Sequence, residues 1–336
     1  AFEKATQQLR PWARPWEEVL LRGEGQQEEL QLPATLDLSS AGLSALLQET
    51  DVDMSVPPVH HTPGGSAAGY ERWSKWIAAG GLKTYASRRN DSLDVHGVSR
   101  MSAYLNAGMV SPMRIAREAN ASSGSGKAKY LNEFLTWRGL SYAHCYHFPM
   151  PATGATLAQL PTWAQQTLRE HASDPRRTIP LPSLMLGQSG DPGWDGMQRY
   201  LVETGELHNN ARMGWGKAVA RWAASPEAAL ATLLTLNNRF ALDGHAPPSY
   251  GGLLGTLGLF EGPKQEGKIL GKVSFRPPKA KYAAMSGIAH QLSSGGSPTG
   301  PSALRTAFPA TRQPQQPQQQ EQQEEEEEQQ QRQQQQ

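Results

Sequence analysis

The chain has 336 residues, of which 38% are hydrophobic, and its mean hydropathy is −0.58. This length allows one large domain or two ordinary ones. The single cysteine, Cys145, excludes a disulfide framework and a cysteine-rich zinc site. The sequence has no run of about 18 apolar residues, so we expect no membrane-spanning helix.

The net charge of +1 is unevenly distributed along the chain. Residues 1–66 carry 4 basic and 10 acidic groups, residues 67–285 carry 25 and 15, and the remainder carries 3 and 6. The central body is therefore strongly positive between two negative ends. This pattern is compatible with a polyanionic partner, and an ordinary solvated surface would also explain it.

The first 65 residues predict little compact structure. Two stretches, 2–21 and 40–47, have helical periodicity, and several prolines and glycines lie between and after them. We interpret residues 1–65 as a linker or the remnant of an upstream domain. No alternation of strands and helices indicates a doubly wound sheet here.

From residue 66 to residue 285 the apolar residues recur with helical spacing, which predicts an all-α domain. One start is well defined, because Ser225 can cap a helix that has Pro226 at its first position and Glu227 in its first turn. The stretch 237–262 is rich in glycine and proline and is not expected to be regular throughout. The predicted helices are 67–79, 130–148, 162–171, 194–202, 209–222 and 226–236.

Residues 286–336 form the last segment. It passes from serine, glycine and proline into glutamine and glutamate. Such a composition cannot bury enough apolar surface to offset the entropy of ordering, so we predict a disordered Gln/Glu-rich tail.

Three short motifs do not carry a function. The Gly124–Lys127 stretch lacks the first glycine and the hydroxyl residue of a phosphate loop. Residues 186–190 lack the spacing of a nucleophile elbow. His144, Cys145 and His147 have no fourth ligand at a suitable spacing, so packing is favoured over a metal site.

Three tryptophans have a suggestive spacing. Trp215 lies 21 residues after Trp194, and Trp222 follows 7 residues later. Seven residues are about two helical turns, which places Trp215 and Trp222 on one helix face about 10 Å apart. Electron transfer between the indoles is one interpretation, and three core aromatic residues are the other.

The surroundings of these tryptophans resemble the flavin-binding helical domain of the photolyase/cryptochrome family. The similarity covers about residues 66–282 and is closest to the class II cyclobutane pyrimidine dimer photolyases, whose relay tryptophans have the same 21- and 7-residue spacings. The resemblance implies an all-α, FAD-binding fold without the family's N-terminal α/β antenna domain. The residues that carry it, in chain order, are Tyr85, residues 89–91, residues 99–102, residues 131–138, residues 205–213 and residues 236–244.

The resemblance assigns most of these residues to an FAD site. Tyr85, Ser99, Met101 and Ser102 would hold the FAD phosphates through hydroxyl and backbone N–H donors. Arg212 and Asp243 would form an ion pair beside the flavin ring, and Asn237 would face flavin N5. Trp215, Trp194 and Trp222 would relay electrons. The FAD-site and relay residues are Tyr85, Ser99, Met101, Ser102, Arg212, Asn237, Asp243, Trp194, Trp215 and Trp222.

The remaining residues would form a pocket for a damaged base. Glu133 resembles the carboxyl that contacts it, and Arg89, Asn90, Trp137 and Met213 resemble further contacts. The implied function is light-driven repair of UV-damaged DNA by electron transfer from reduced FAD to a flipped-out lesion, a lyase reaction. The alternatives are a cryptochrome-like blue-light photosensor that has lost repair and a helical remnant that binds no flavin. We expect a monomer, and for its compartment the nucleus or chloroplast is favoured over secretion.

Some positions depart from the family pattern. The second pocket tryptophan is replaced by Gly255, and the glutamate that follows the Trp-Arg pair is replaced by Gly139. The usual S-P-Y-L-H-F-G motif reads S-A-Y-L-N-A-G over residues 102–108. These changes affect the expectation of repair more than that of flavin binding.

Overall fold

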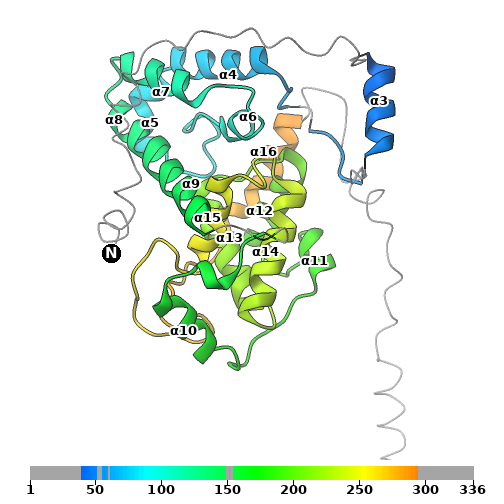
Figure 1. The fold of residues 1–336 in the computed structure, drawn as a ribbon, viewed down its shortest axis with the longest axis vertical. Coiled ribbons are helices and arrows are strands. Elements are labelled where there is room, and N and C mark those ends of the chain that lie inside the picture. Colours follow the sequence, from blue (N-terminus) through cyan, green and yellow to red (C-terminus); the bar gives the residue numbers. More distant parts are fainter. Residues whose placement is uncertain (1–38, 51–54, 60, 149–150, 152–153, 294–336) are drawn as a thin grey trace, which may run out of the picture. The chain divides into compact units, whose positions relative to one another are not determined.

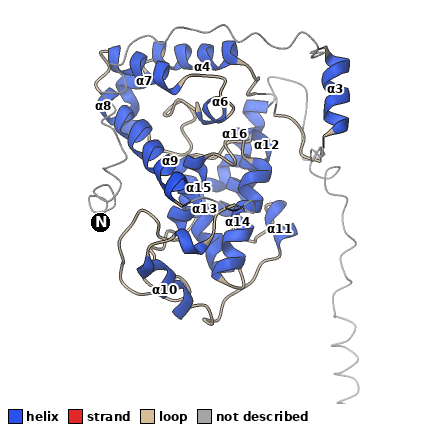
Figure 2. Cartoon of the chain, in the orientation of Figure 1, coloured by secondary structure: helices blue, strands red, loops and turns tan. Residues whose placement is uncertain are grey.

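The computed structural model describes residues 39–50, 55–59, 61–148, 151 and 154–293. The chain divides into two compact units, Ala1–Pro298 and Thr299–Gln336, and the second lies outside the described residues. So do the helix predicted over 2–21 and most of the predicted tail. The described part is helical and contains no strand, as Figure 2 shows. The prediction of an all-α fold is confirmed.

The first group of elements runs from α3 to α9 (Figure 1). Three of its helices, α4, α5 and α8, pack in sequence around a buried aromatic core, and α7 packs on α8. A single π-helical turn, η1, separates α8 from α9. The elements are α3 Ser40–Glu49, α4 Ser66–Ala78, α5 Gly81–Arg88, α6 Ser102–Asn106, α7 Pro112–Ala121, α8 Lys127–Leu131, η1 Asn132–Thr136 and α9 Trp137–His147.

The second group forms a bundle centred on α12 and α13. Helix α12 packs against α16, η3 and α13, while α13 also contacts α14 and α15. Helix α15 packs on α9 and so joins the two groups. The elements are η2 Leu157–Gln159, α10 Thr162–Glu170, α11 Leu181–Met185, α12 Pro192–Thr204, α13 Asn209–Trp222, α14 Pro226–Phe240, α15 Pro247–Thr256, η3 Ala280–Ala284 and α16 Met285–Ser293.

Capping residues explain where several helices begin. The Ser225 side chain accepts a hydrogen bond from Ala228 N at 3.2 Å, which confirms the predicted start of α14. Asp191 caps α12 in the same way. The ring of His208 caps α13 by accepting from Asn210 N at 3.1 Å. These caps satisfy backbone N–H donors in the first turn and so favour the residue at which each of these helices begins.

Two predicted boundaries differ from the structure. The helical body continues past residue 285, because Met285 and Ala289 are buried where α16 packs on α12. Before residue 66, the Pro63 carbonyl accepts a hydrogen bond from Tyr104 Oη at 2.9 Å. Composition could not predict the packing of α16 on α12 or the bond between Tyr104 and Pro63, because both join residues far apart in the chain. In the described part of the chain, no helix has the length and apolar character to cross a membrane.

Candidate functional site

A cavity of about 580 Å³ lies where the two groups of helices meet. This volume is in the range of small-molecule and cofactor sites. Its wall combines residues from α5, the loop before α6, η1, the start of α13 and α15. Sequence regions more than a hundred residues apart therefore line one cavity.

One wall of the cavity is organised by an arginine on α13. Arg212 Nη2 donates to Asp243 Oδ1 at 2.8 Å, and Arg212 Nη1 donates to Ser249 Oγ at 3.2 Å. Ser249 in turn donates to Asn237 Oδ1 at 3.0 Å. The predicted triad of Arg212, Asp243 and Asn237 thus converges in one hydrogen-bonded network. A fixed guanidinium of this kind can stabilise negative charge on a neighbouring group.

Asn237 takes a place in this network that differs from the sequence expectation. Arg212 and Asp243 line the cavity, whereas Asn237 is fully buried behind Ser249. Its Nδ2 donates to Asn238 Oδ1 at 3.0 Å, so both ends of the amide have partners within the chain. Direct contact between Asn237 and a cofactor stays a prediction. In this structure Asn237 is connected to the cavity through Ser249 and Arg212.

The loop before α6 forms a second wall. Ser99, Met101 and Ser102 all line the cavity, and so does Tyr85 of α5. Their role in phosphate binding stays a prediction. Arg100 has a φ of 53°, a left-handed conformation that is uncommon outside glycine. The turn at Arg100 lies between the flanking hydroxyl residues on this wall.

Glu206 holds this loop in place, and the sequence gave no reason to single it out. Its Oε2 accepts a hydrogen bond from Arg100 Nε at 2.7 Å, and its Oε1 accepts from Arg72 Nη1 at 3.2 Å and from Thr62 Oγ1 at 3.0 Å. Burial raises the pKa of this carboxyl, but the neighbouring His61 ring and the guanidinium groups of Arg100 and Arg72 outweigh burial and lower the Glu206 pKa to about 2. Glu206 therefore remains ionised and links Thr62, Arg72 and Arg100 to the loop before α13.

Glu133 lies on the π-helical turn η1, an irregularity that often marks functional positions. Arg89 Nη2 lies 2.8 Å from Glu133 Oε2, and Lys129 Nζ lies 2.6 Å from Glu133 Oε1. Both Glu133 and Arg89 line the cavity, together with Trp137 and Met213. Four of the five predicted base-contact residues therefore share this wall.

Asn90, the fifth predicted residue, is placed beside the cavity wall and not on it. Its Oδ1 accepts hydrogen bonds from Arg89 Nη1 at 3.0 Å and from Asn210 Nδ2 at 3.1 Å. Asn90 therefore positions two cavity-lining side chains. Its direct contact with a base stays a prediction.

The three predicted relay tryptophans pack in one cluster. The ring centroids of Trp194 and Trp215 are 6.1 Å apart with nearly parallel planes, and those of Trp194 and Trp222 are 5.5 Å apart in an edge contact. Trp194 and Trp215 are fully buried, whereas Trp222 is half-buried. The contact order is therefore Trp215, Trp194, Trp222, with the outermost ring last. None of the three lines the cavity, which Arg212 and Met213 reach from the preceding turn of α13.

The lining has polar capacity that the described chain does not use. Arg89 Nε, Arg100 Nη2 and His208 Nε2 are buried nitrogens without a hydrogen-bond partner among the described residues. Buried donors of this kind are normally satisfied by water or a ligand. Guanidinium groups beside serine hydroxyls are the donor set that suits a phosphate. These residues fit a phosphate-bearing dinucleotide such as FAD.

Burial also shifts the charge state of two cavity residues. It lowers the pKa of His208, which favours the neutral ring that caps α13. It lowers the pKa of Lys217 as well, although the ion pair with Glu261, at 3.2 Å, acts in the opposite direction.

The two glycine replacements have different surroundings. Gly255 lines the cavity, and a Cβ at this position would meet no atom within 4 Å. Gly139 is exposed on α9, and its Cβ would also meet nothing. The missing pocket tryptophan therefore leaves open space at α15, while the change at residue 139 affects only the surface.

The candidate metal residues do not form a cluster in the structure. His144 is buried, Cys145 is half-buried, and burial raises the pKa of the Cys145 thiol to about 11. Within the described ranges, no group of three or more His, Cys, Asp or Glu side chains could hold a metal ion. Packing is the role that this geometry supports for His144, which contacts Phe148 and Phe260.

Comparison with known proteins gives consistent relatives. The chain is 33% identical over 199 residues to a deoxyribodipyrimidine photo-lyase of Arabidopsis thaliana. It is 31% identical over 213 residues to one of Methanothermobacter thermautotrophicus and 31% identical over 229 residues to one of Potorous tridactylus. These matches cover 58%, 63% and 67% of this chain but only 40%, 46% and 42% of the relatives. The chain therefore spans less than half the length of these curated relatives.

The fold is also similar to that of a solved photolyase. A class III photolyase from Agrobacterium tumefaciens superimposes with a TM-score of 0.50 at 17% sequence identity, covering 72% of this chain and 50% of that one. No family model matches the sequence. The chain is therefore similar in sequence to photolyases over part of their length, and its helical fold is similar to part of a solved photolyase. The relatives include proteins from plants, an archaeon and an animal, so the class II subtype is not distinguished.

Proposed function

We propose that this chain is the flavin-binding and substrate-binding part of a light-driven DNA photolyase, closest to the class II enzymes, in the photolyase/cryptochrome family that its relatives support. Its cofactor would be FAD and its substrate UV-damaged DNA with a pyrimidine dimer. One observation carries the proposal. The Arg212–Asp243 pair, the Ser99–Ser102 loop and the Glu133–Arg89 pair all line one cavity of about 580 Å³.

The first task of these residues is to bind and orient the cofactor. Ser99 and Ser102 would donate hydroxyl hydrogen bonds to its phosphates, and Arg100 lies between them. Arg212, fixed by Asp243 and Ser249, would hold negative charge at the flavin ring. When bound and reduced, FAD would supply one electron on light absorption. The buried Trp215–Trp194 stack with its half-buried neighbour Trp222 would carry electrons from the surface toward this site.

The second task is to hold a base outside the duplex. Trp137 and Met213 provide apolar surface, while Glu133 and Arg89 provide an acceptor and a donor that are already oriented by their mutual ion pair. A flipped base needs this combination of stacking and edge hydrogen bonds. The 10-unit positive charge of residues 67–285 would favour the approach of DNA phosphates.

The test combines a cofactor assay with a repair assay. The purified chain should retain a yellow flavin, and after full reduction it should split a thymine dimer in an oligonucleotide under blue light. Glu133→Gln should lower repair about tenfold or more, since it removes a charged acceptor, without loss of flavin. Glu71→Gln is the matched control, because Glu71 is an exposed helical glutamate that is also ion-paired at i,i+4 with a lysine. A reduced, flavin-loaded chain that leaves the dimer intact would contradict repair.

A second candidate function is a blue-light photosensor that binds FAD without repair. The open space at Gly255 favours it, because a missing stacking ring can cost about 1–3 kcal/mol of base binding. The two functions predict different results. A photosensor should photoreduce its flavin without repairing DNA, and Gly255→Trp, which places a ring in open space, should then raise affinity for dimer-containing DNA.

A further inference from the structure

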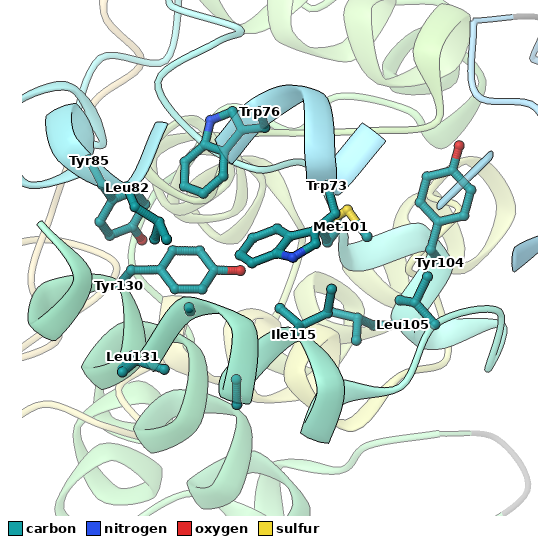
Figure 3. Close-up of a cluster of buried hydrophobic side chains, with 13 residues drawn as sticks. Trp73, Trp76, Leu82, Tyr85, Met101, Tyr104, Leu105, Ile115, Tyr130 and Leu131 are labelled. Atoms are coloured by element: carbon teal, nitrogen blue, oxygen red, sulfur yellow. The ribbon is translucent and has the colours of Figure 1, made fainter. Parts of the chain in front are cut away.

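A second set of aromatic rings lies in the core of the α4–α8 group, where Figure 3 shows Tyr85, Tyr130, Trp76 and Trp73. Tyr85, Tyr130 and Phe134 all line the cavity. The Tyr130 ring centroid lies 5.2 Å from that of Tyr85 and 5.7 Å from that of Phe134. Tyr130 is therefore a cavity-lining ring that contacts both of the other two.

From Tyr130 the contacts continue into the core. Trp73 and Trp76 each lie 5.5 Å from Tyr130 between ring centroids, and they are 5.6 Å from each other in a stacked arrangement. We call Tyr130, Trp76 and Trp73 the second aromatic path. Its centroid spacings of 5.5–5.6 Å are similar to the 6.1 and 5.5 Å of the Trp215–Trp194–Trp222 cluster.

The two clusters differ in what the indole N–H groups contact. Trp73 Nε1 donates to Glu118 Oε2, a carboxylate oxygen, at 2.7 Å. In contrast, Trp215 Nε1 donates to the Gln198 side-chain carbonyl at 2.9 Å, and Trp194 Nε1 donates to a backbone carbonyl at 3.0 Å. An indole that loses an electron becomes a strong N–H acid. Only a carboxylate can accept that proton, and charge-assisted hydrogen bonds of this type are the stronger ones.

Glu118 also connects the path to solvent. Its side chain is 37% exposed and forms an ion pair with Arg114 at 2.7 Å. A proton that reaches Glu118 can therefore leave to water, although Trp73 itself is fully buried. The path thus has a ring at the cavity, a buried terminal indole and a solvent-exposed base.

We propose that Tyr130, Trp76 and Trp73 form a second electron-donating path to a flavin in the cavity, with Glu118 as the proton acceptor. The inference rests on the proposed function, because it needs a photo-excited oxidised flavin as the oxidant. One electron passes from Trp73 across the rings in contact, and the flavin is reduced by one electron. The Trp73 Nε1 proton moves to Glu118 Oε2, which leaves a neutral indolyl radical. A thiolate in solution then gives one electron to this radical and becomes a thiyl radical, while Glu118, whose exposed carboxyl exchanges its proton with water, returns a proton to Trp73 Nε1.

The test measures anaerobic photoreduction of the flavin-loaded full chain by dithiothreitol. Trp215→Phe removes the innermost ring of the other cluster and should leave a measurable rate. Adding Trp73→Phe should lower that residual rate at least threefold, while adding Trp163→Phe, a half-buried tryptophan outside both clusters, should leave it unchanged. Equal rates with and without Trp73 would overturn the proposal.

Glu118→Gln tests the proton transfer without removing a buried aromatic side chain. The amide oxygen can still accept the Trp73 hydrogen bond but cannot take the proton, so the neutral indolyl radical should be lost from the transient absorption spectrum. Oxidised Trp73 should also accumulate in tryptic peptides after illumination in air, and less so in Glu118→Gln. A neutral-radical signal unchanged by Glu118→Gln would overturn the role of the carboxylate. A chain that retains no flavin overturns the proposed function and this path together, whereas retained flavin with equal rates overturns the path alone.

Discussion

The Glu206 carboxylate links the predicted phosphate loop to the rest of the fold, and replacing it should destabilise the protein by a calculable amount. Glu206→Gln keeps the size of the side chain and one acceptor but removes the charge that faces Arg100 at 2.7 Å and Arg72 at 3.2 Å. The Glu206 pKa falls from an ordinary 4.5 to about 2, which corresponds to about 3 kcal/mol. This is in the range of about 3–5 kcal/mol expected when one partner of a buried ion pair is removed.

The pH dependence gives the sign of the effect. Because folding lowers the pKa of Glu206, its stabilisation is complete at pH values well above 4.5 and is lost as the pH falls toward about 2. The difference in unfolding free energy between wild type and Glu206→Gln should be about 3 kcal/mol at pH 7 and about 2 kcal/mol at pH 3.5.

Urea unfolding followed by circular dichroism at both pH values measures this difference. Glu170→Gln is the matched control, because Glu170 is exposed and contacts only the Gln166 amide, at 2.8 Å, among the hydrogen bonds of the described chain. It should change stability by less than about 0.5 kcal/mol. A Glu206→Gln protein as stable as this control at pH 7 would refute the reasoning, and so would a difference that does not shrink with acid.

Three further results are expected. The ion pairs with Glu266 and Asp174 raise the pKa of His171. The stabilisation of the fold by His171 is therefore present below pH 6.5 and is lost as the pH rises through the raised pKa. His171→Ala should lower Tm at pH 6 and have little effect on Tm at pH 9. Ser225→Ala removes the cap of α14 and should cost about 1 kcal/mol in urea unfolding. Arg212→Lys cannot keep two hydrogen bonds in the same geometry, so flavin affinity should fall about tenfold by equilibrium dialysis; unchanged affinity would contradict the role of this network.

Local sequence signals predicted the helices that carry their own caps and periodicity. Helix α14 begins at the predicted Ser225–Pro226 cap, and α13 has the predicted bounds 209–222. The stretch 237–262 was expected not to be regular throughout, and in the structure α14 continues to Phe240 and α15 occupies Pro247–Thr256, with loops before and after α15. Helix α15 is rich in glycine and has little intrinsic helix propensity, so its packing on α9 and α13 decides its conformation.

The candidate site also shows a difference between what the sequence predicts and what tertiary contacts decide. The resemblance to the photolyase/cryptochrome family singled out Arg212, Asp243, Glu133 and Ser99, because the residues that carry it occur in the family's order along the chain. Which atoms meet depends on contacts between segments far apart in the chain. The position of Asn237 behind Ser249, the π-helical turn that carries Glu133 and the role of Glu206 as partner to two arginines could not be deduced from local patterns.

The sequence by itself determined that this protein is helical and which of its side chains could bind phosphate, hold charge or donate electrons. Only the tertiary structure decided which of them share the cavity, which rings touch and which carboxylates are held ionised. The reason is physical: helix formation depends on neighbours a few residues apart, whereas pKa shifts, ring contacts and cavities arise from burial against partners a hundred or more residues away.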